Sequence, residues 1–238
     1  MVLHLEGAPD LRAVASASFA PSGPGYDPKL RLRRRFLALR GGADALVIAF
    51  SWVSGVVRVR ILAQGACVSE DIECAIATAR AVAATDDDPT EFYAMVRRHP
   101  VLGPLARRRD PRIARTPSVF ESFAVAVIEQ LVTGIEARAS VRRLWRIAGE
   151  VVMGTNLRAA PTAPAALRVP MWKLREIGIG ARRAATLHEG ARRGDALERL
   201  RSHAPEVAIA KLQSLHGVGP WTANAVARAG LGLSLIHI

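Results

Sequence analysis

The sequence predicts an α+β fold in which a small mixed α/β N-terminal domain, residues 1–88, precedes a mostly α-helical domain, residues 89–232. Two observations carry this prediction. Apolar and polar residues alternate as in strands only before residue 65, whereas the later segments repeat apolar residues at helical intervals. A chain of 238 residues is long enough to bury a core and to form one or two domains.

The segment ALVIAFSWVSGVVRVRILAQG, residues 45–65, predicts a β-hairpin. Apolar residues alternate with Arg58 and Arg60, and Ser54 and Gly55 supply a turn between two β-branched runs. The following SEDIECAIATARAVAA predicts a helix over residues 69–84, because acidic residues occupy its first turn and apolar residues share one face.

Beyond residue 89 the pattern is helical. Ser118 and Glu121 have the spacing of a capping box before an apolar run, which predicts a buried helix over residues 118–133. Gly178 is typical of a helix end and Pro205 of a helix start. Further helices are expected at EARASVRRLWRIAGE, MWKLREIG, ARRAATLHEGARRG and PEVAIAKLQSL, whereas APTAPAAL, residues 160–167, has the composition of a loop.

Charge and cysteine content limit the classes of protein. The net charge is +12, and 30 of the 33 basic residues are arginine, which favours a polyanionic partner. On charge alone, an arginine-rich composition with solvated side chains explains this equally well.

With only Cys67 and Cys74, neither a disulfide framework nor a four-thiolate metal site is expected. No apolar run is long enough to span a membrane and no signal peptide is visible, so we expect a cytoplasmic protein without a membrane partner.

The segment LHGVGPWTANAVARAGLG, residues 215–232, predicts a tight reversal between two helices. Gly217 and Gly219 permit positive φ or a close approach, and Pro220 suits a first helical turn. The unpaired N–H groups of that turn can hold a phosphate. An ordinary glycine turn between two helices is the alternative that the Gly-Val-Gly string alone leaves open.

The longer string LQSLHGVGPWTANAVARAGLG resembles the helix-hairpin-helix of the DNA glycosylase superfamily, and most of all the DNA-3-methyladenine glycosylase II branch. RTPSVFESFAVAVIEQLVTGIEARAS and LREIGIGARRAATL are similar to that family's segments in the same order, over about 140 residues. The resemblance implies a helix-hairpin-helix glycosylase domain for residues 89–232. It also implies a monomeric base-excision repair enzyme that hydrolyses the N-glycosidic bond of alkylated purines in double-stranded DNA. Phosphate binding would fall to Gly217, Val218, Gly219 and Thr222.

The resemblance also assigns roles around the base. Backbone-cutting members carry a lysine nucleophile where this sequence has Trp221, so a monofunctional enzyme is expected. Trp221 and Gln130 would line the base pocket, and Leu131 would fill the gap left by the flipped nucleotide. Two alternatives stay open: Trp221 can pack between helices, and Leu131 also fits the apolar face of its own helix.

A monovalent cation, Na⁺ or K⁺, is a further implication of the resemblance. The main-chain carbonyls of Gln213, Leu215 and Val218 would hold it beside the phosphate site. No other cofactor is expected.

The catalytic aspartate of the family is expected about twenty residues after Gly219, a position that would follow residue 238. Residues 233–238, LSLIHI, equal the translation of a common sequencing adapter, so we expect them to be foreign to the gene and this chain to be inactive. A natural apolar C-terminus is the alternative. A non-catalytic helix-hairpin-helix DNA-binding module is the second function class, and Trp221 argues against the third, a bifunctional lyase.

Overall fold

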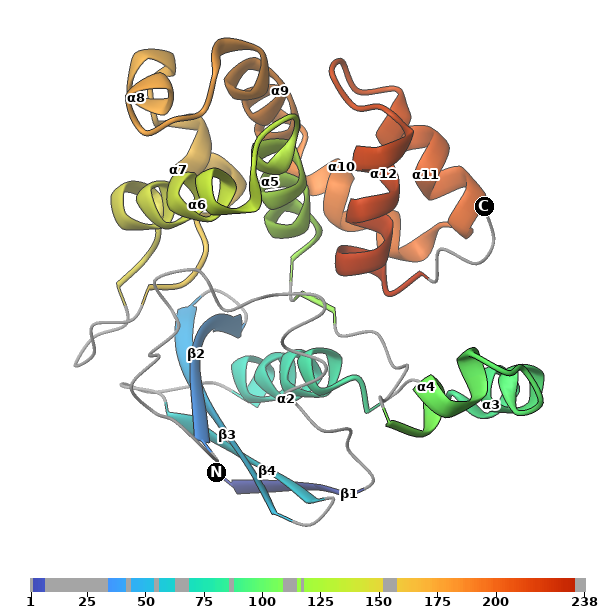
Figure 1. Cartoon of the computed structure of the whole chain (residues 1–238). Helices are drawn as coiled ribbons and strands as arrows, with labels where there is room; N and C mark the ends of the chain where they lie inside the picture. The colour runs from blue at the N-terminus through green and yellow to red at the C-terminus, as the bar shows by residue number, and fades with distance from the viewer. Residues whose placement is uncertain are drawn as a thin grey trace.

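The protein is mostly helical, as the sequence predicts for the larger part of the chain. The structure is a computed structural model, and it describes residues 2–6, 34–41, 44–53, 56–62, 69–85, 88–108, 115–116, 118–151 and 158–233. Figure 1 shows the helices of the second half gathered together, with the strands and α2 on one side of them. Cys67 and the tail after Leu233 lie outside the described residues.

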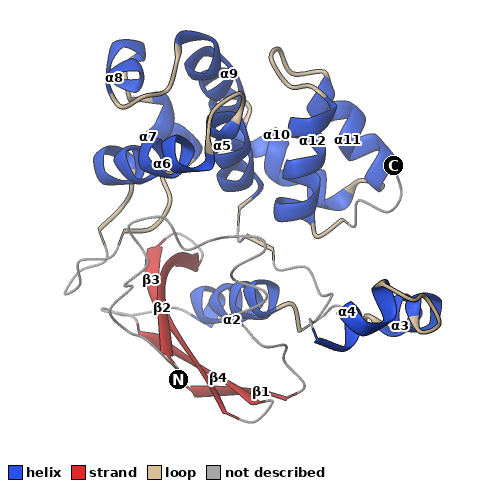
Figure 2. Ribbon diagram, viewed as in Figure 1, coloured by secondary structure: helices blue, strands red, loops and turns tan. Residues whose placement is uncertain are grey.

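Four antiparallel strands form one sheet in the order β1-β4-β3-β2. They are β1 (Val2–Glu6), β2 (Arg34–Gly41), β3 (Asp44–Val53) and β4 (Val56–Leu62). Val53 pairs with Val56, as the predicted hairpin requires, although its turn residues themselves are outside the described part. The helix α2 (Ser69–Ala83) contacts β2 and β3, and Figure 2 shows it lying beside the sheet.

The helices that follow are 5 to 15 residues long. In chain order they are α3 (Thr90–Val96), α4 (Leu102–Arg108), α5 (Val119–Glu129), α6 (Gly134–Ala148), α7 (Ala163–Leu167), α8 (Met171–Glu176), α9 (Ala181–Arg192), α10 (Gly194–Glu198), the 3₁₀ turn η1 (Arg199–Ser202), α11 (Pro205–Gln213), α12 (Pro220–Val226) and its π-helical continuation η2 (Ala227–Leu231). Strand pairing among the described residues of this half is limited to one isolated bridge between Val151 and Arg158.

The helix α5 forms the centre of the core. It contacts α6, α9, α10, α12 and η2, and Figure 1 shows it between the α6–α9 group and the α10–α12 group. Phe123 and Ile128 are fully buried, together with Leu144 of α6, Leu187 of α9 and Leu212 of α11. A helix surrounded on most sides must be apolar on most sides, which explains why the α5 segment is the most continuous apolar run of this half. Burial on this scale fixes the direction in which the C-terminal end of α5 emerges.

The N-terminus of α5 is capped differently from the prediction. Ser118 Oγ accepts from Glu121 N at 3.2 Å, which is half of the predicted capping box. The carboxylate that completes the cap belongs to Glu198 of α10: it accepts from Ser118 Oγ at 2.6 Å and from the N–H groups of Val119 and Phe120, each at 3.0 Å. Glu121 is instead buried in the core. A side chain remote in sequence thus replaced the local partner, because its carboxylate reaches two unpaired N–H groups at once.

Two other helix ends agree with the sequence and one segment does not. Gly178 has φ +93° after α8, and Pro205 is the first residue of α11. The segment 160–167, expected to be a loop, contains α7. Thr162 caps it by accepting from Ala165 N at 3.3 Å, and Pro164 occupies the first turn, where proline is tolerated. Among the described residues, no helix has the length and apolarity needed to cross a bilayer.

Candidate functional site

The turn between α11 and α12 is built from two glycines that serve different purposes. Gly217 has φ +81°, and a Cβ there would overlap the Thr186 hydroxyl of α9. Gly219 caps α12 with φ −92°, and a Cβ on it would meet no atom within 4 Å. Folding therefore requires a glycine at position 217 but gives no steric reason for one at position 219. The open space in front of Gly219 leaves room for a ligand to approach the main chain.

The first turn of α12 presents unpaired donors at this open position. Pro220 is its first residue, and Ala223 N is the first to donate within the turn, to Gly219 O at 3.0 Å. The N–H groups of Trp221 and Thr222 precede that bond and have no intrahelical acceptor. Leu215 and Val218, which shape the turn, are buried, and Val218 N donates to Leu215 O at 3.1 Å. A turn anchored by two buried side chains thus presents an anion-attracting helix end at the surface.

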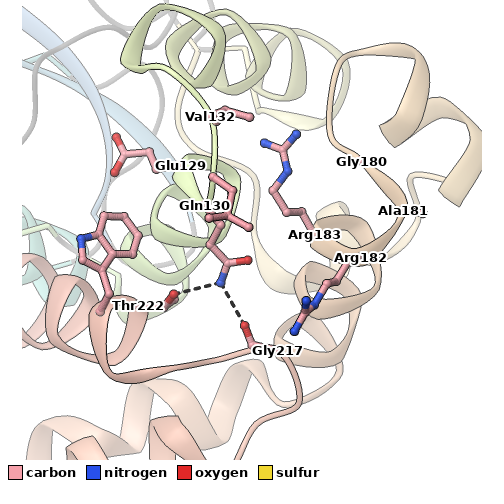
Figure 3. A pocket seen from close by; sticks show the side chains of 11 residues that line it. Glu129, Gln130, Val132, Gly180, Ala181, Arg182, Arg183, Gly217 and Thr222 are labelled. Atoms are coloured by element: carbon pink, nitrogen blue, oxygen red, sulfur yellow. Dashed lines mark hydrogen bonds between the residues drawn. The ribbon is translucent and has the colours of Figure 1, made fainter.

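Gln130 joins the end of α5 to this hairpin. Its Nε2 donates to Gly217 O at 3.0 Å and to Thr222 Oγ1 at 2.9 Å, as Figure 3 shows. The Thr222 side chain is only 3% exposed and is occupied by this bond, so its hydroxyl does not face a phosphate as a side-chain ligand would. Of the four residues predicted to bind phosphate, Thr222 can therefore contribute its main-chain N–H.

Leu131 projects from the end of α5 into solvent. It is 99% exposed and has φ +53°, a conformation that is rare and unfavourable for a residue other than glycine. The alternative of burial on the apolar face of its own helix is wrong, because α5 ends at Glu129 and Gln130 has already left helical geometry. A strained backbone that displays a large apolar side chain to water is typical of a functional position.

Arg183 of α9 holds the same helix end from the other side. Its guanidinium donates to Ile128 O at 2.6 Å and to Gly178 O at 3.0 Å. Charge-assisted bonds of this kind orient both main-chain segments. Together with Gln130, Arg183 fixes the main chain just before Leu131.

A pocket of about 630 Å³ opens between the end of α5, the start of α9 and the hairpin. Its lining comprises Glu129, Gln130, Leu131, Val132, Gly180, Ala181, Arg182, Arg183, Gly217, Trp221 and Thr222 (Figure 3). Trp221 is 59% exposed, so the alternative of a tryptophan packed between helices is wrong. The pocket has the size of a small-molecule site. Its lining combines the Trp221 indole with acidic and basic side chains.

The structure brings together residues that the sequence singled out separately. Gln130, Leu131, Gly217, Trp221 and Thr222 all line this pocket. The lining also includes three charged residues that the sequence motifs do not indicate: Glu129, Arg182 and Arg183. Glu129 directly precedes Gln130, and the two arginines lie in the segment GIGARRA. Their position beside recognisable motifs is the one sequence signal that could have indicated a role in the pocket.

Comparisons with known proteins support the same fold. No protein-family profile and no curated protein sequence matches the chain. Among solved structures, a 3-methyladenine DNA-glycosylase from Archaeoglobus fulgidus is similar, with 23% identity, a TM-score of 0.81, and coverage of 98% of this chain and 80% of that one. An 8-oxoguanine glycosylase/lyase from Clostridium acetobutylicum, in complex with double-stranded DNA, has 15% identity, a TM-score of 0.73 and coverage of 98% and 79%. The chain therefore has the fold of the helix-hairpin-helix DNA glycosylases.

Proposed function

We propose that this protein is a base-excision repair DNA glycosylase that removes alkylated purines, of the 3-methyladenine type, from double-stranded DNA. The observation that carries the proposal is that one surface holds three parts of such an enzyme. Leu131 is displayed as an apolar wedge, a pocket with an exposed indole lies beside it, and an open glycine at a helix N-terminus faces outward. A wedge replaces a flipped base in the stack, a pocket receives that base, and the N–H groups bind the backbone phosphate.

Water is the nucleophile in this proposal. Trp221 cannot attack the sugar carbon, so the enzyme is monofunctional. Hydrolysis also needs a carboxylate that stabilises the positive charge on the sugar. Asp195 is the last aspartate of the sequence and precedes the hairpin, so we propose that the 238-residue chain is inactive. For the chain itself, this absence favours the second candidate, a non-catalytic DNA-binding module.

Three further parts of the proposal concern organisation. Residues 1–88 would form a mixed α/β domain, residues 89–232 would form the helical domain, and the protein would act as a monomer. The carbonyl oxygens of Gln213, at the end of α11, and of Leu215 and Val218, in the hairpin, are hard donors suited to Na⁺ or K⁺. A cation held there would add positive charge beside the phosphate and would supply no chemistry of its own.

The Gly219→Asp substitution tests phosphate binding at the hairpin. It places a carboxylate in the open space before the α12 N-terminus, where it repels phosphate and occupies the N–H groups. We expect affinity for a short DNA duplex at low salt to fall about tenfold, and the dependence of affinity on salt to become less steep. Fluorescence anisotropy at several salt concentrations measures both quantities.

Ala204→Asp is the matched control for this experiment. Ala204 is the exposed N-cap of α11, whose nine residues separate it from the hairpin by about 13 Å. The added charge is the same, and aspartate suits an N-cap. If both variants fold and bind DNA equally well, the hairpin does not contact the phosphate and the proposal fails at this point.

A further inference from the structure

Glu129 is the last residue of α5, and its position is electrostatically unfavourable in three ways. The carboxylate stands at the negative end of the helix dipole. Partial burial raises the pKa of Glu129, although the charges of Arg228 and Arg138 act in the opposite direction. The surface it belongs to is the one proposed to face DNA, whose phosphates repel a carboxylate. A polar or apolar residue would avoid all three penalties.

Among the residues that the structure describes, the charges of Arg228 and Arg138 favour the carboxylate, but no direct bond compensates for this placement. Among the described residues, no hydrogen bond to the Glu129 side chain and no ion pair within 4 Å of it occurs. The arginines that line the same pocket are not its partners: Figure 3 shows Glu129 well apart from Arg182 and Arg183, and Arg183 is bonded to main-chain oxygens. The Glu129 side chain therefore lines the pocket without a hydrogen-bonded or ion-paired partner among the described residues.

Glu129 is also the only acidic residue among the described residues that line the pocket, and it shares the pocket with the exposed indole of Trp221. An indole attracts a cation over its face, and a carboxylate attracts the same cation by charge. A purine alkylated at N3 or N7 in DNA carries a positive charge on its ring. Neutral altered bases such as hypoxanthine do not.

We propose that Glu129 is a specificity-determining residue that selects cationic bases over neutral ones in the Trp221 pocket. This inference rests on the proposed function and adds a means of discrimination to it. The carboxylate would lower the affinity for ordinary DNA and for neutral flipped bases. Only a positively charged base would offset this loss of affinity, by its attraction to the carboxylate. Specificity then comes from repulsion of the wrong ligand as well as attraction of the right one.

The test compares the binding of three DNA duplexes that differ at one base: 7-methylguanine, guanine and hypoxanthine. The proteins are the 238-residue chain, Glu129→Gln, Glu129→Asp and the control Glu91→Gln, which removes the same charge from an exposed position on α3. We expect Glu129→Gln to reduce the preference for 7-methylguanine over hypoxanthine about fivefold. The same variant should bind the guanine duplex more tightly than the unsubstituted chain does. Glu129→Asp, which keeps the charge, should keep the preference, and so should Glu91→Gln.

The two proposals fail in different ways. If the unsubstituted chain prefers 7-methylguanine and Glu129→Gln retains that preference in full, the role of Glu129 is contradicted and the proposed function is not. If the unsubstituted chain binds the 7-methylguanine and guanine duplexes equally, the proposed recognition of alkylated purines is contradicted, and the role of Glu129 with it. Equal losses in Glu129→Gln and Glu91→Gln would indicate a general charge effect and would also contradict the inference.

Discussion

The free energy of unfolding should fall as pH rises from about 5 to 8, and the Glu121→Gln substitution should remove most of this fall. Burial in the core raises the pKa of Glu121 from 4.5 to about 8, and the nearby charge of Glu198 also raises it. The folded protein thus keeps a proton that the unfolded chain releases near pH 4.5. Stabilisation by the neutral carboxyl group is complete below that pH and is lost as pH rises through the folded-state pKa.

The expected size makes this a large effect. A tenfold difference in proton affinity between the folded and unfolded chains corresponds to about 1.4 kcal/mol, so the total loss between the two pKa values is several kcal/mol. Urea unfolding at pH 5 and pH 8 measures it, with Glu91→Gln as the exposed control. Glutamine has nearly the same shape as a protonated glutamate, so Glu121→Gln should be the more stable protein at pH 8. Parallel pH profiles for the substituted and unsubstituted chains would show that Glu121 does not stay protonated in the fold.

Gly217→Ala should destabilise the protein by roughly 2–4 kcal/mol, whereas Gly219→Ala should change stability by less than about 1 kcal/mol. Gly217 has positive φ, and a methyl group on it would overlap the buried Thr186 side chain. Gly219 has an ordinary φ and open space beside it. The two glycines of one turn are thus matched controls for each other.

DNA binding should also distinguish these two variants, and here the larger effect is expected for Gly219→Ala, the variant with the smaller loss of stability. Gly219→Ala leaves a folded protein whose added methyl group occupies the space where a phosphate would approach, so its affinity for duplex DNA should fall. Thermal unfolding measures the stability of each variant, and anisotropy titrations measure its affinity for duplex DNA. Similar stability losses in both variants would mean that the turn does not have the described geometry.

Local signals in the sequence predicted most of the helical half. The starts of α5 and α11 and the glycine end of α8 depend on residues a few positions away, so they are readable without the fold. The capping of α5 by Glu198 was not predictable, because that pair is separated by 80 positions and only packing brings it together. The helix α7 was missed because Ala and Pro composition outweighed the Thr162 cap.

The site was predicted in part, and its geometry was not. The hairpin glycines, Gln130, Leu131 and Trp221 were recognisable by motif. The periodicity of α5 continues through Leu131, so the sequence left burial open; the helix ends earlier because Gln130 bonds to the hairpin and Arg183 bonds to Ile128 O. The position of Glu129 at the edge of the pocket depends on the same helix end. Tertiary hydrogen bonds therefore decided which predicted residues face the ligand.

In the proposed function, the pocket serves the hydrolysis of a glycosidic bond. The transition state carries positive charge on the sugar, and a fixed carboxylate that stabilises it is worth several kcal/mol, or about a hundredfold or more in rate. A protein extended past residue 232 to include the expected aspartate should therefore be active, and its Asp→Asn variant should lose about that factor.

The most direct measurement is the release of free 3-methyladenine from methylated duplex DNA by three proteins. These are the extended protein, its Asp→Asn variant and the 238-residue chain. We predict release by the extended protein and, at comparable concentration, little or none by the other two, although the 238-residue chain should still bind the DNA. Equal release by the chain and the extended protein would contradict the placement of the catalytic group. No release by any of the three would contradict the assignment as a DNA glycosylase for alkylated purines.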